Sequence, residues 1–193
     1  FESWHMRELI NVRIPQPINH FDENQLWRVL LDEKNIVLSL DLMDSDSLVQ
    51  GESWNGDWLS PMGLDLQING GLGLAFSKLT FEDLPKLSAL LDQLWLDGVD
   101  GICPTIVSSE LDDLRLSLEV FRQARHSSAA RRCQLLGAHL EGPFLDKARH
   151  GAHSLENLCL PTLGALNQLL RGFEDEVDIL TLAPELTGAS DLI

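Results

Sequence analysis

The sequence lacks the long apolar run that a membrane-spanning helix needs. Crossing a bilayer takes roughly 20 predominantly apolar residues, and no segment of the 193 residues approaches that length. Positive charge is also scarce, because 14 Lys and Arg residues stand against 30 Asp and Glu residues, for a net charge of −16. Nucleic acids and anionic membranes carry phosphate charge, so this balance argues against both as partners.

Cysteine is scarce, and the cysteines are not spaced as pairs. The three cysteines are Cys103, Cys133 and Cys159, an odd number without a Cys-x-x-Cys pair, and the chain has no signal-like start. These features predict free thiols in a reducing cytoplasm. A phosphate-binding Gly-x-x-x-x-Gly-Lys loop and a Gly-x-Ser-x-Gly nucleophile elbow are absent as well, so neither mechanism is supported.

Residues 1–60 differ from the rest of the chain. Short apolar runs lie at Leu9–Ile14, Trp27–Leu31 and Ile36–Leu42, separated by clusters of turn-forming residues. Closely spaced short strands predict a small β-rich segment. The Asn55-Gly56 pair predicts a tight turn. We find no candidate chemistry in this segment.

From about residue 61 to residue 193 the pattern changes to strands that alternate with amphipathic helices. Apolar runs predict four strands, at Leu64–Asn69, Gly101–Ile106, Leu135–Glu141 and Asp178–Ala183. Such βα units predict an α/β fold with a parallel sheet. Two architectures fit, a doubly wound sheet or a partial (β/α)8 TIM-type barrel of about four βα units.

Three helices are expected between these strands. Thr80 could cap the first helix, but Pro85 belongs in a first turn, which favours Asp83 as the cap. Gly98 closes that helix. Ser109 resembles the start of the second helix. Pro161 is expected in the first turn of the third helix.

The third expected strand carries the best candidate for chemistry. His139 and Glu141 are two residues apart, so they lie on one face of a strand that stops at Gly142-Pro143. A carboxylate at the carboxyl end of a buried strand is where parallel α/β proteins place catalytic groups. The alternative is a strand-end carboxylate that is satisfied by nearby backbone amides.

Several polar residues are expected at the same edge of the sheet. They are Gln67, Asn69, His139, Glu141 and Glu185. Such residues can converge on a divalent metal, and Glu141 is the best single ligand candidate among them. His139 fits a hydrogen-bonded strand residue better than a metal ligand, while Gln67, Asn69 and Glu185 fit structural roles. In the following loop, His153 fits either a metal pair with His150 or hydrogen bonding to a polar ligand.

Four segments together resemble the N-acetylglucosamine-6-phosphate deacetylases of the amidohydrolase superfamily. The most similar is His139-Leu140-Glu141-Gly142-Pro143-Phe144, followed by Gly151-Ala152-His153. The others are Ser60 to Gly71, Cys103-Pro104-Thr105-Ile106 and Thr181-Leu182-Ala183-Pro184-Glu185. Their order and spacing agree with the first four barrel strands of that family, over about residues 59–187. The first 60 residues correspond to the family's small β-sandwich in general character only.

The resemblance implies a metal-dependent barrel enzyme. Its reaction is hydrolysis of the N-acetyl group of N-acetylglucosamine 6-phosphate to glucosamine 6-phosphate and acetate, and the full-length family suggests a homodimer. The implied roles are metal ligation by Glu141 and substrate contact by Ala152 and His153, with Gln67, Asn69 and His139 as secondary site residues. Gln67 and Asn69 stand where many amidohydrolases carry a His-x-His pair, which favours one divalent metal ion, such as zinc or iron.

The resemblance also implies an incomplete site. The family takes two further metal histidines and its catalytic aspartate from later strands, and no histidine follows His153 here. We therefore expect no catalytic residue in this chain, and an inactive amino-terminal portion of the enzyme. Two alternatives stay open: a non-catalytic half-barrel that binds a sugar phosphate or complements another chain, and an amidohydrolase that acts on a different amide.

Overall fold

The computed structural model describes the chain except for residues 1–5, 16–21, 23, 45–49 and 127–130. The chain divides into two compact units, Phe1–Pro61 and Met62–Ile193.

The first unit contains a four-stranded sheet in the order β3-β2-β1-β4. Antiparallel pairs join β1 to β2 and β2 to β3, whereas the short β4 runs parallel to β1. Its buried apolar cluster is formed by Leu9, Val12, Val29 and Leu31. The bounds are β1 Arg7–Val12, β2 Trp27–Leu31, β3 Val37–Leu42 and β4 Glu52–Ser53.

The Asn55-Gly56 turn forms as predicted, with positive φ angles of 52° and 85°. Asn and Gly are the residues that adopt this left-handed conformation most readily. The described strands of this unit belong to one sheet, so the predicted sandwich stays a prediction.

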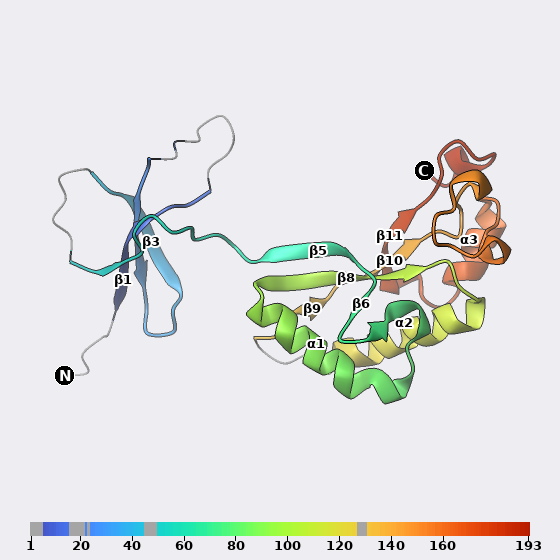
Figure 1. Cartoon of the computed structure of the whole chain (residues 1–193), viewed down its shortest axis with the longest axis horizontal. Helices are drawn as coiled ribbons and strands as arrows, with labels where there is room; N and C mark the ends of the chain where they lie inside the picture. Colours follow the sequence, from blue (N-terminus) through green and yellow to red (C-terminus); the bar gives the residue numbers. More distant parts are fainter. Residues whose placement is uncertain (1–5, 16–21, 23, 45–49, 127–130) are drawn as a thin grey trace. The chain divides into compact units, whose positions relative to one another are not determined.

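The second unit is built on a parallel sheet in the order β11-β10-β8-β5 (Figure 1). A short additional strand, β9, pairs with β8, while β6 and β7 form a separate small hairpin. Strands of the main order follow one another in space as they do along the chain. A doubly wound sheet reverses its order at a switch point, and these four strands contain no such reversal. The bounds are β5 Gly63–Ile68, β6 Gly70–Gly71, β7 Leu74–Ala75, β8 Val99–Val107, β9 Gln134–Leu135, β10 Ala138–Glu141 and β11 Val177–Thr181.

All four predicted strands form, with ends that differ by one or two residues, and one of them is interrupted. The predicted strand Leu135–Glu141 is interrupted, because Gly137 donates its backbone N–H to the Asp178 carboxylate at 2.8 Å. A Cβ at Gly137 would collide with that carboxylate, so the interruption needs glycine. The last strand was predicted to reach Ala183 but ends at Thr181.

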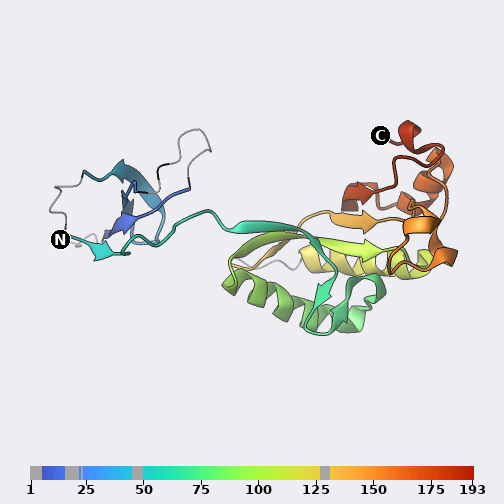
Figure 2. The ribbon, with the colours of Figure 1, turned by 45° about the horizontal axis from the view of Figure 1, so that its top comes forward.

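Helices α1 (Leu84–Leu96) and α2 (Leu111–His126) lie along one face of the sheet, and α3 is Leu163–Leu170 (Figures 1 and 2). The buried core of this unit joins helix residues such as Leu87, Leu118 and Phe121 to Ile106 and Leu140 of the strands. Among the described residues, no helix combines the length and the apolar character that a bilayer crossing requires.

The helix ends contradict one of the sequence predictions and confirm two others. Thr162 caps α3 by accepting a hydrogen bond from the Ala165 N–H at 3.2 Å, so Pro161 lies before the cap and not in the first turn. Asp83 occupies the N-cap position of α1 and Pro85 lies in the first turn, as predicted. The Asp83 side chain makes no capping hydrogen bond to α1, and its carboxylate accepts from the Thr80 N–H at 2.9 Å. Gly98 follows α1 with a φ of 86°, as predicted for a helix end.

Candidate functional site

The candidate site lies at the carboxyl end of β10. Residues paired across parallel strands point to the same face, and Leu140, paired with Ile106, belongs to the core on the helix side. His139 and Glu141 therefore point to the opposite face. Gly142 then turns the chain with a φ of 87°, and a Cβ at that position would collide with Ser108 Oγ.

His139 is buried between two threonines of the flanking strands. Its Nδ1 lies 3.1 Å from Thr105 Oγ1 of β8, and its Nε2 lies 2.8 Å from Thr181 Oγ1 of β11. Burial lowers the pKa of His139 below 6.5, against the opposing charge of Glu141. Both ring nitrogens are engaged, so this arrangement is that of a hydrogen-bonded strand residue.

Glu141 and His153 are brought together from different segments. Nε2 of His153 lies 3.8 Å from Oε1 of Glu141, too long for a hydrogen bond but within the range of an ion pair. The His153 side chain is 9% exposed and that of Glu141 is 26% exposed. A partly open carboxylate beside a nearly buried imidazole can bind a polar ligand from the open side.

Ser108 fixes the His153 ring from the other side. The Ser108 backbone N–H donates to His153 Nδ1 at 3.3 Å, and Ser108 Oγ lies 2.9 Å from the same nitrogen. His150 supports the loop, because its Nδ1 lies 2.7 Å from the His153 carbonyl oxygen. Asn157 donates its side-chain amide to the Ser108 carbonyl at 3.4 Å.

The remaining predicted site residues do not join this cluster. Gln67 and Asn69 are exposed at the end of β5, and strand β8 separates β5 from β10. Ala152 is exposed in the loop before His153. Glu185 is also exposed, beyond the end of β11.

Sequence reasoning missed Ser108 and Asn157. Ser108 directly follows β8, and polar residues at the carboxyl ends of parallel strands are the signal that identifies it. Asn157 lies in a loop and gives no comparable signal. Ser109 was predicted to start α2, yet its Oγ is buried and without a hydrogen-bond partner, so it does not cap the helix.

The residues present do not fit a complete metal centre. No group of three or more His, Cys, Asp or Glu side chains in the described part of the chain could hold a metal ion. His139, the other imidazole on this face, is held by Thr105 and Thr181. A catalytic zinc site takes three protein ligands, and Glu141 with His153 would supply at most two.

No protein-family model matches the chain. It is 32% identical over 171 residues to the N-acetylglucosamine-6-phosphate deacetylase of Caenorhabditis elegans, a match that covers 85% of this chain and 39% of the nematode protein. The human N-acetylglucosamine-6-phosphate deacetylase is 37% identical over 144 residues, covering 72% of this chain and 34% of the relative. The chain thus spans about a third to two-fifths of these curated relatives.

Solved structures of such deacetylases resemble this chain in their fold. The N-acetylglucosamine-6-phosphate deacetylase of Pasteurella multocida superposes with a TM-score of 0.66 at 21% identity, covering 97% of this chain and 47% of that chain. A Mycobacterium smegmatis mutant enzyme in complex with N-acetyl-D-glucosamine-6-phosphate gives a TM-score of 0.66 at 22% identity, with coverage of 97% and 46%. Both likenesses concern an α/β fold with a parallel sheet.

Proposed function

The chain is homologous to part of the N-acetylglucosamine-6-phosphate deacetylases, and we propose that it is an amino-terminal portion of such a hydrolase. Its reaction would release acetate from N-acetylglucosamine 6-phosphate. The sheet would form the first four strands of a (β/α)8 barrel, in which case the sequential order β5, β8, β10, β11 is the expected one. Residues 61–193 would belong to that barrel, and residues 1–60 to a small β-rich domain.

One observation supports this proposal most directly. Glu141 and His153, the two site residues that most resemble the family, lie 3.8 Å apart at the carboxyl end of a parallel strand. Carboxyl ends of barrel strands are where enzymes of this architecture bind substrates. Glu141 would then be a ligand of the metal ion, and Ala152 and His153 would contact the sugar.

The state of the His153 ring suits contact with a hydroxyl group. Because Nδ1 accepts from the Ser108 N–H, Nε2 carries the ring proton and can donate a hydrogen bond to a sugar oxygen. Nearby charge suits the phosphate group as well. Lys147 and Arg149 are exposed in the loop that leads to His153, and they are the basic residues we assign to the phosphate.

The proposal includes one divalent metal ion, such as zinc or iron. A bound divalent ion polarises an amide carbonyl and lowers the pKa of bound water. Glu141 would be one ligand, and the other ligands would come from residues outside this sequence, since the described residues contain no complete set. The chain alone would therefore be inactive. A cytoplasmic location and a homodimer of the longer protein complete the proposal.

Complementation tests the proposed function. Residues 1–193 are co-expressed with the segment of the nematode relative that follows its match to this chain, and acetate release from N-acetylglucosamine 6-phosphate is measured with added zinc. We expect release by the pair and none by residues 1–193 alone.

A matched pair of variants makes the test specific. Glu141→Gln should abolish the complemented activity, whereas Glu185→Gln, at the end of the neighbouring strand β11, should retain it. Equal activity of both variants would contradict the role of Glu141. Metal-dependent turnover by residues 1–193 alone would contradict the incompleteness of the site.

A further inference from the structure

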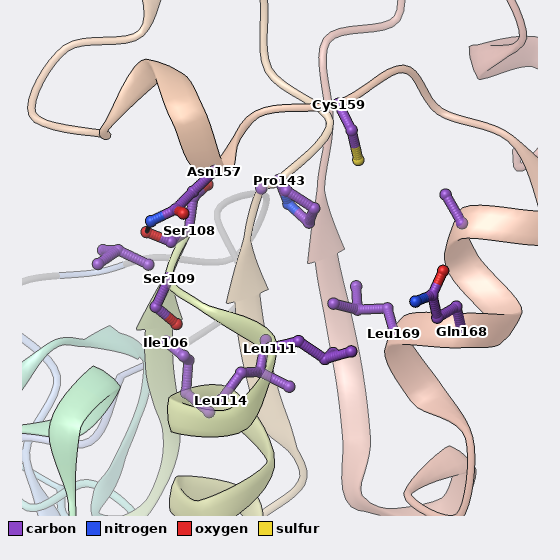
Figure 3. A pocket seen from close by; sticks show the side chains of 13 residues that line it. Ile106, Ser108, Ser109, Leu111, Leu114, Pro143, Asn157, Cys159, Gln168 and Leu169 are labelled. Atoms are coloured by element: carbon purple, nitrogen blue, oxygen red, sulfur yellow. Dashed lines mark hydrogen bonds between the residues drawn. The ribbon is translucent and has the colours of Figure 1, made fainter.

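The two faces of the parallel sheet in the second unit differ in how they are covered. On the helix side, Leu111 of α2 and Leu169 of α3 face each other and belong to the core (Figure 3). Leu64 of β5 lies on the other face, because it pairs with Gly101, whose neighbour Ile102 belongs to the helix-side core. Leu64 is 58% exposed. The face opposite the helices therefore presents apolar surface to solvent at β5.

Both edges of this sheet are free in the described part of the chain. Strand β5 forms one edge and β11 forms the other, and the two strands have similar lengths, six and five residues. An edge strand exposes unpaired backbone N–H and C=O groups, and an apolar edge favours pairing with a strand of another chain. Leu66, also on β5, is 53% exposed and adds to the apolar character of that edge.

The number and direction of the strands indicate which partner fits these edges. The four strands of the main order are parallel and sequential, and eight such strands close a barrel. A twofold rotation about the barrel axis places β11 of one copy beside β5 of another and keeps every strand parallel. The same rotation joins both edges at once. A closed barrel has no free edge that could recruit a third copy.

We propose that two copies of this chain associate through their second units, so that β5 of each copy pairs with β11 of the other and an eight-stranded barrel closes. Leu64 would then pack inside the barrel instead of facing water. This inference rests on the barrel architecture of the proposed function but not on its reaction, and it concerns the 193 residues as they stand.

Strand β3 of the first unit is the alternative interface. It is also an edge strand, and its Leu42 is 56% exposed. Pairing of β3 with β3 of a second copy would join the two chains at one edge only, and β4 would stay an edge of that sheet. The second unit loses both of its edges in one association, so we place the interface there.

Sedimentation velocity of the purified chain over a range of micromolar concentrations measures the association. We expect a reversible equilibrium between monomer and dimer without larger species, because the closed barrel leaves no edge to extend. Each copy carries a net charge of −16, so two copies repel each other. Added salt screens this repulsion and should lower the dissociation constant of the dimer.

A matched pair of substitutions locates the interface. Leu64→Lys should raise the dissociation constant about tenfold or more, because an inward-pointing charge on an edge strand blocks pairing. Leu42→Lys, at a leucine of similar exposure on the other edge strand, should leave the dissociation constant unchanged. Both substitutions make the net charge less negative by the same amount, so weaker association of Leu64→Lys alone cannot come from repulsion between the copies.

The fold of each variant is checked by circular dichroism. Leu66→Lys, on the same strand as Leu64, is a second variant that should also weaken the dimer, and it replaces Leu64→Lys if that variant does not fold. Three results would overturn the proposal: a chain that stays monomeric at every concentration, a continuous series of species larger than a dimer, or dissociation by Leu42→Lys with none by the β5 variants.

The dimer and the proposed function are tested separately. A monomeric chain that gains activity from the nematode segment would overturn the dimer and leave the deacetylase function standing. A dimeric chain that gains no activity from that segment would contradict the deacetylase function and leave the dimer standing.

Discussion

Ser108 and His153 are joined by two contacts to one ring nitrogen. The Ser108 backbone N–H and its Oγ lie 3.3 and 2.9 Å from His153 Nδ1. A backbone N–H can only donate, so Nδ1 is the acceptor and the ring proton lies on Nε2. This places an N–H donor next to Glu141, at the open side of the candidate site.

The first prediction concerns Ser108→Ala. This change removes the contacts of Oγ with His153 Nδ1 and with the Glu141 carbonyl oxygen, 3.3 Å away, but it keeps the backbone N–H, so His153 should keep its proton on Nε2. Loss of one buried hydrogen bond should lower the free energy of unfolding by about 0.5–1.5 kcal/mol. Urea denaturation measures the free energy, and ¹⁵N chemical shifts of the ring nitrogens report the tautomer. A proton on Nδ1 in this variant would contradict the assignment of the backbone N–H as the determining contact.

The second prediction concerns His139, which we interpret as a structural residue. His139→Ala would open a cavity and leave Thr105 and Thr181 without their imidazole partner. We expect the free energy of unfolding to fall by about 2–4 kcal/mol. His126→Ala, at the exposed end of α2, is the control and should change it by less than about 0.5 kcal/mol. Urea denaturation at pH 8 compares the two variants, and similar small effects would contradict a structural role for His139.

The third prediction is the pH dependence that His139 produces. Its pKa in the folded chain is below the ordinary 6.5, first because of burial. The unfolded chain therefore binds a proton before the folded chain does as the pH falls. The contribution of His139 to stability should be complete above pH 6.5 and should decline below it. His139→Gln removes this titration, so the difference in unfolding free energy between wild type and variant should shrink as the pH falls below 6.5.

The four parallel strands were predictable from the sequence pattern, but their lateral order and the details of two strands were not. Alternating apolar strands and amphipathic helices identify the βα units, because burial on both faces needs continuous apolar runs. The break at Gly137 depends on Asp178, a residue far along the chain, and no local pattern reveals that contact. Strand ends likewise depend on tertiary partners.

In the candidate site, too, some residues were predictable from the sequence and others were not. Glu141 is recognisable because a carboxylate directly precedes Gly142-Pro143 at the end of an apolar run. The partners of His139 are not recognisable, because Thr105 and Thr181 meet its ring only through the lateral order of three strands. For Ser109 the sequence pattern predicts a contact that does not form. Serine is favoured at a helix start, yet the Ser109 hydroxyl has no hydrogen-bond partner.

The fourth prediction concerns metal binding by the chain. A ligand that binds only the folded state raises its stability in proportion to the logarithm of concentration over Kd. The described residues contain no complete ligand set, so zinc at micromolar concentration should leave the melting temperature equal to that measured in EDTA. A zinc-dependent increase that Glu141→Gln abolishes would contradict this expectation and would show that Glu141 has further ligands within the chain.

The last prediction concerns Glu176, which links α2 to the start of β11. Its carboxylate accepts from Arg122 Nε at 2.9 Å and also pairs with Arg125, and its side chain is only 14% exposed. Burial raises the pKa of Glu176, but the hydrogen bond from Arg122 and the charge of Arg125 together lower it by more than burial raises it. The pKa of Glu176 is therefore below 4.5. Glu176→Gln should reduce the free energy of unfolding by about 1–3 kcal/mol near neutral pH.

The sign of the pH effect follows from that lowered pKa. The stabilisation by Glu176 should be complete above pH 4.5 and should be lost as the pH falls through the lower value of the folded chain. The difference between wild type and Glu176→Gln should therefore decrease only below pH 4.5. Asp175→Asn, an exposed neighbour, is the control and should have little effect at any pH. If Asp175→Asn and Glu176→Gln destabilise the chain equally, the link between α2 and β11 does not depend on this ion pair.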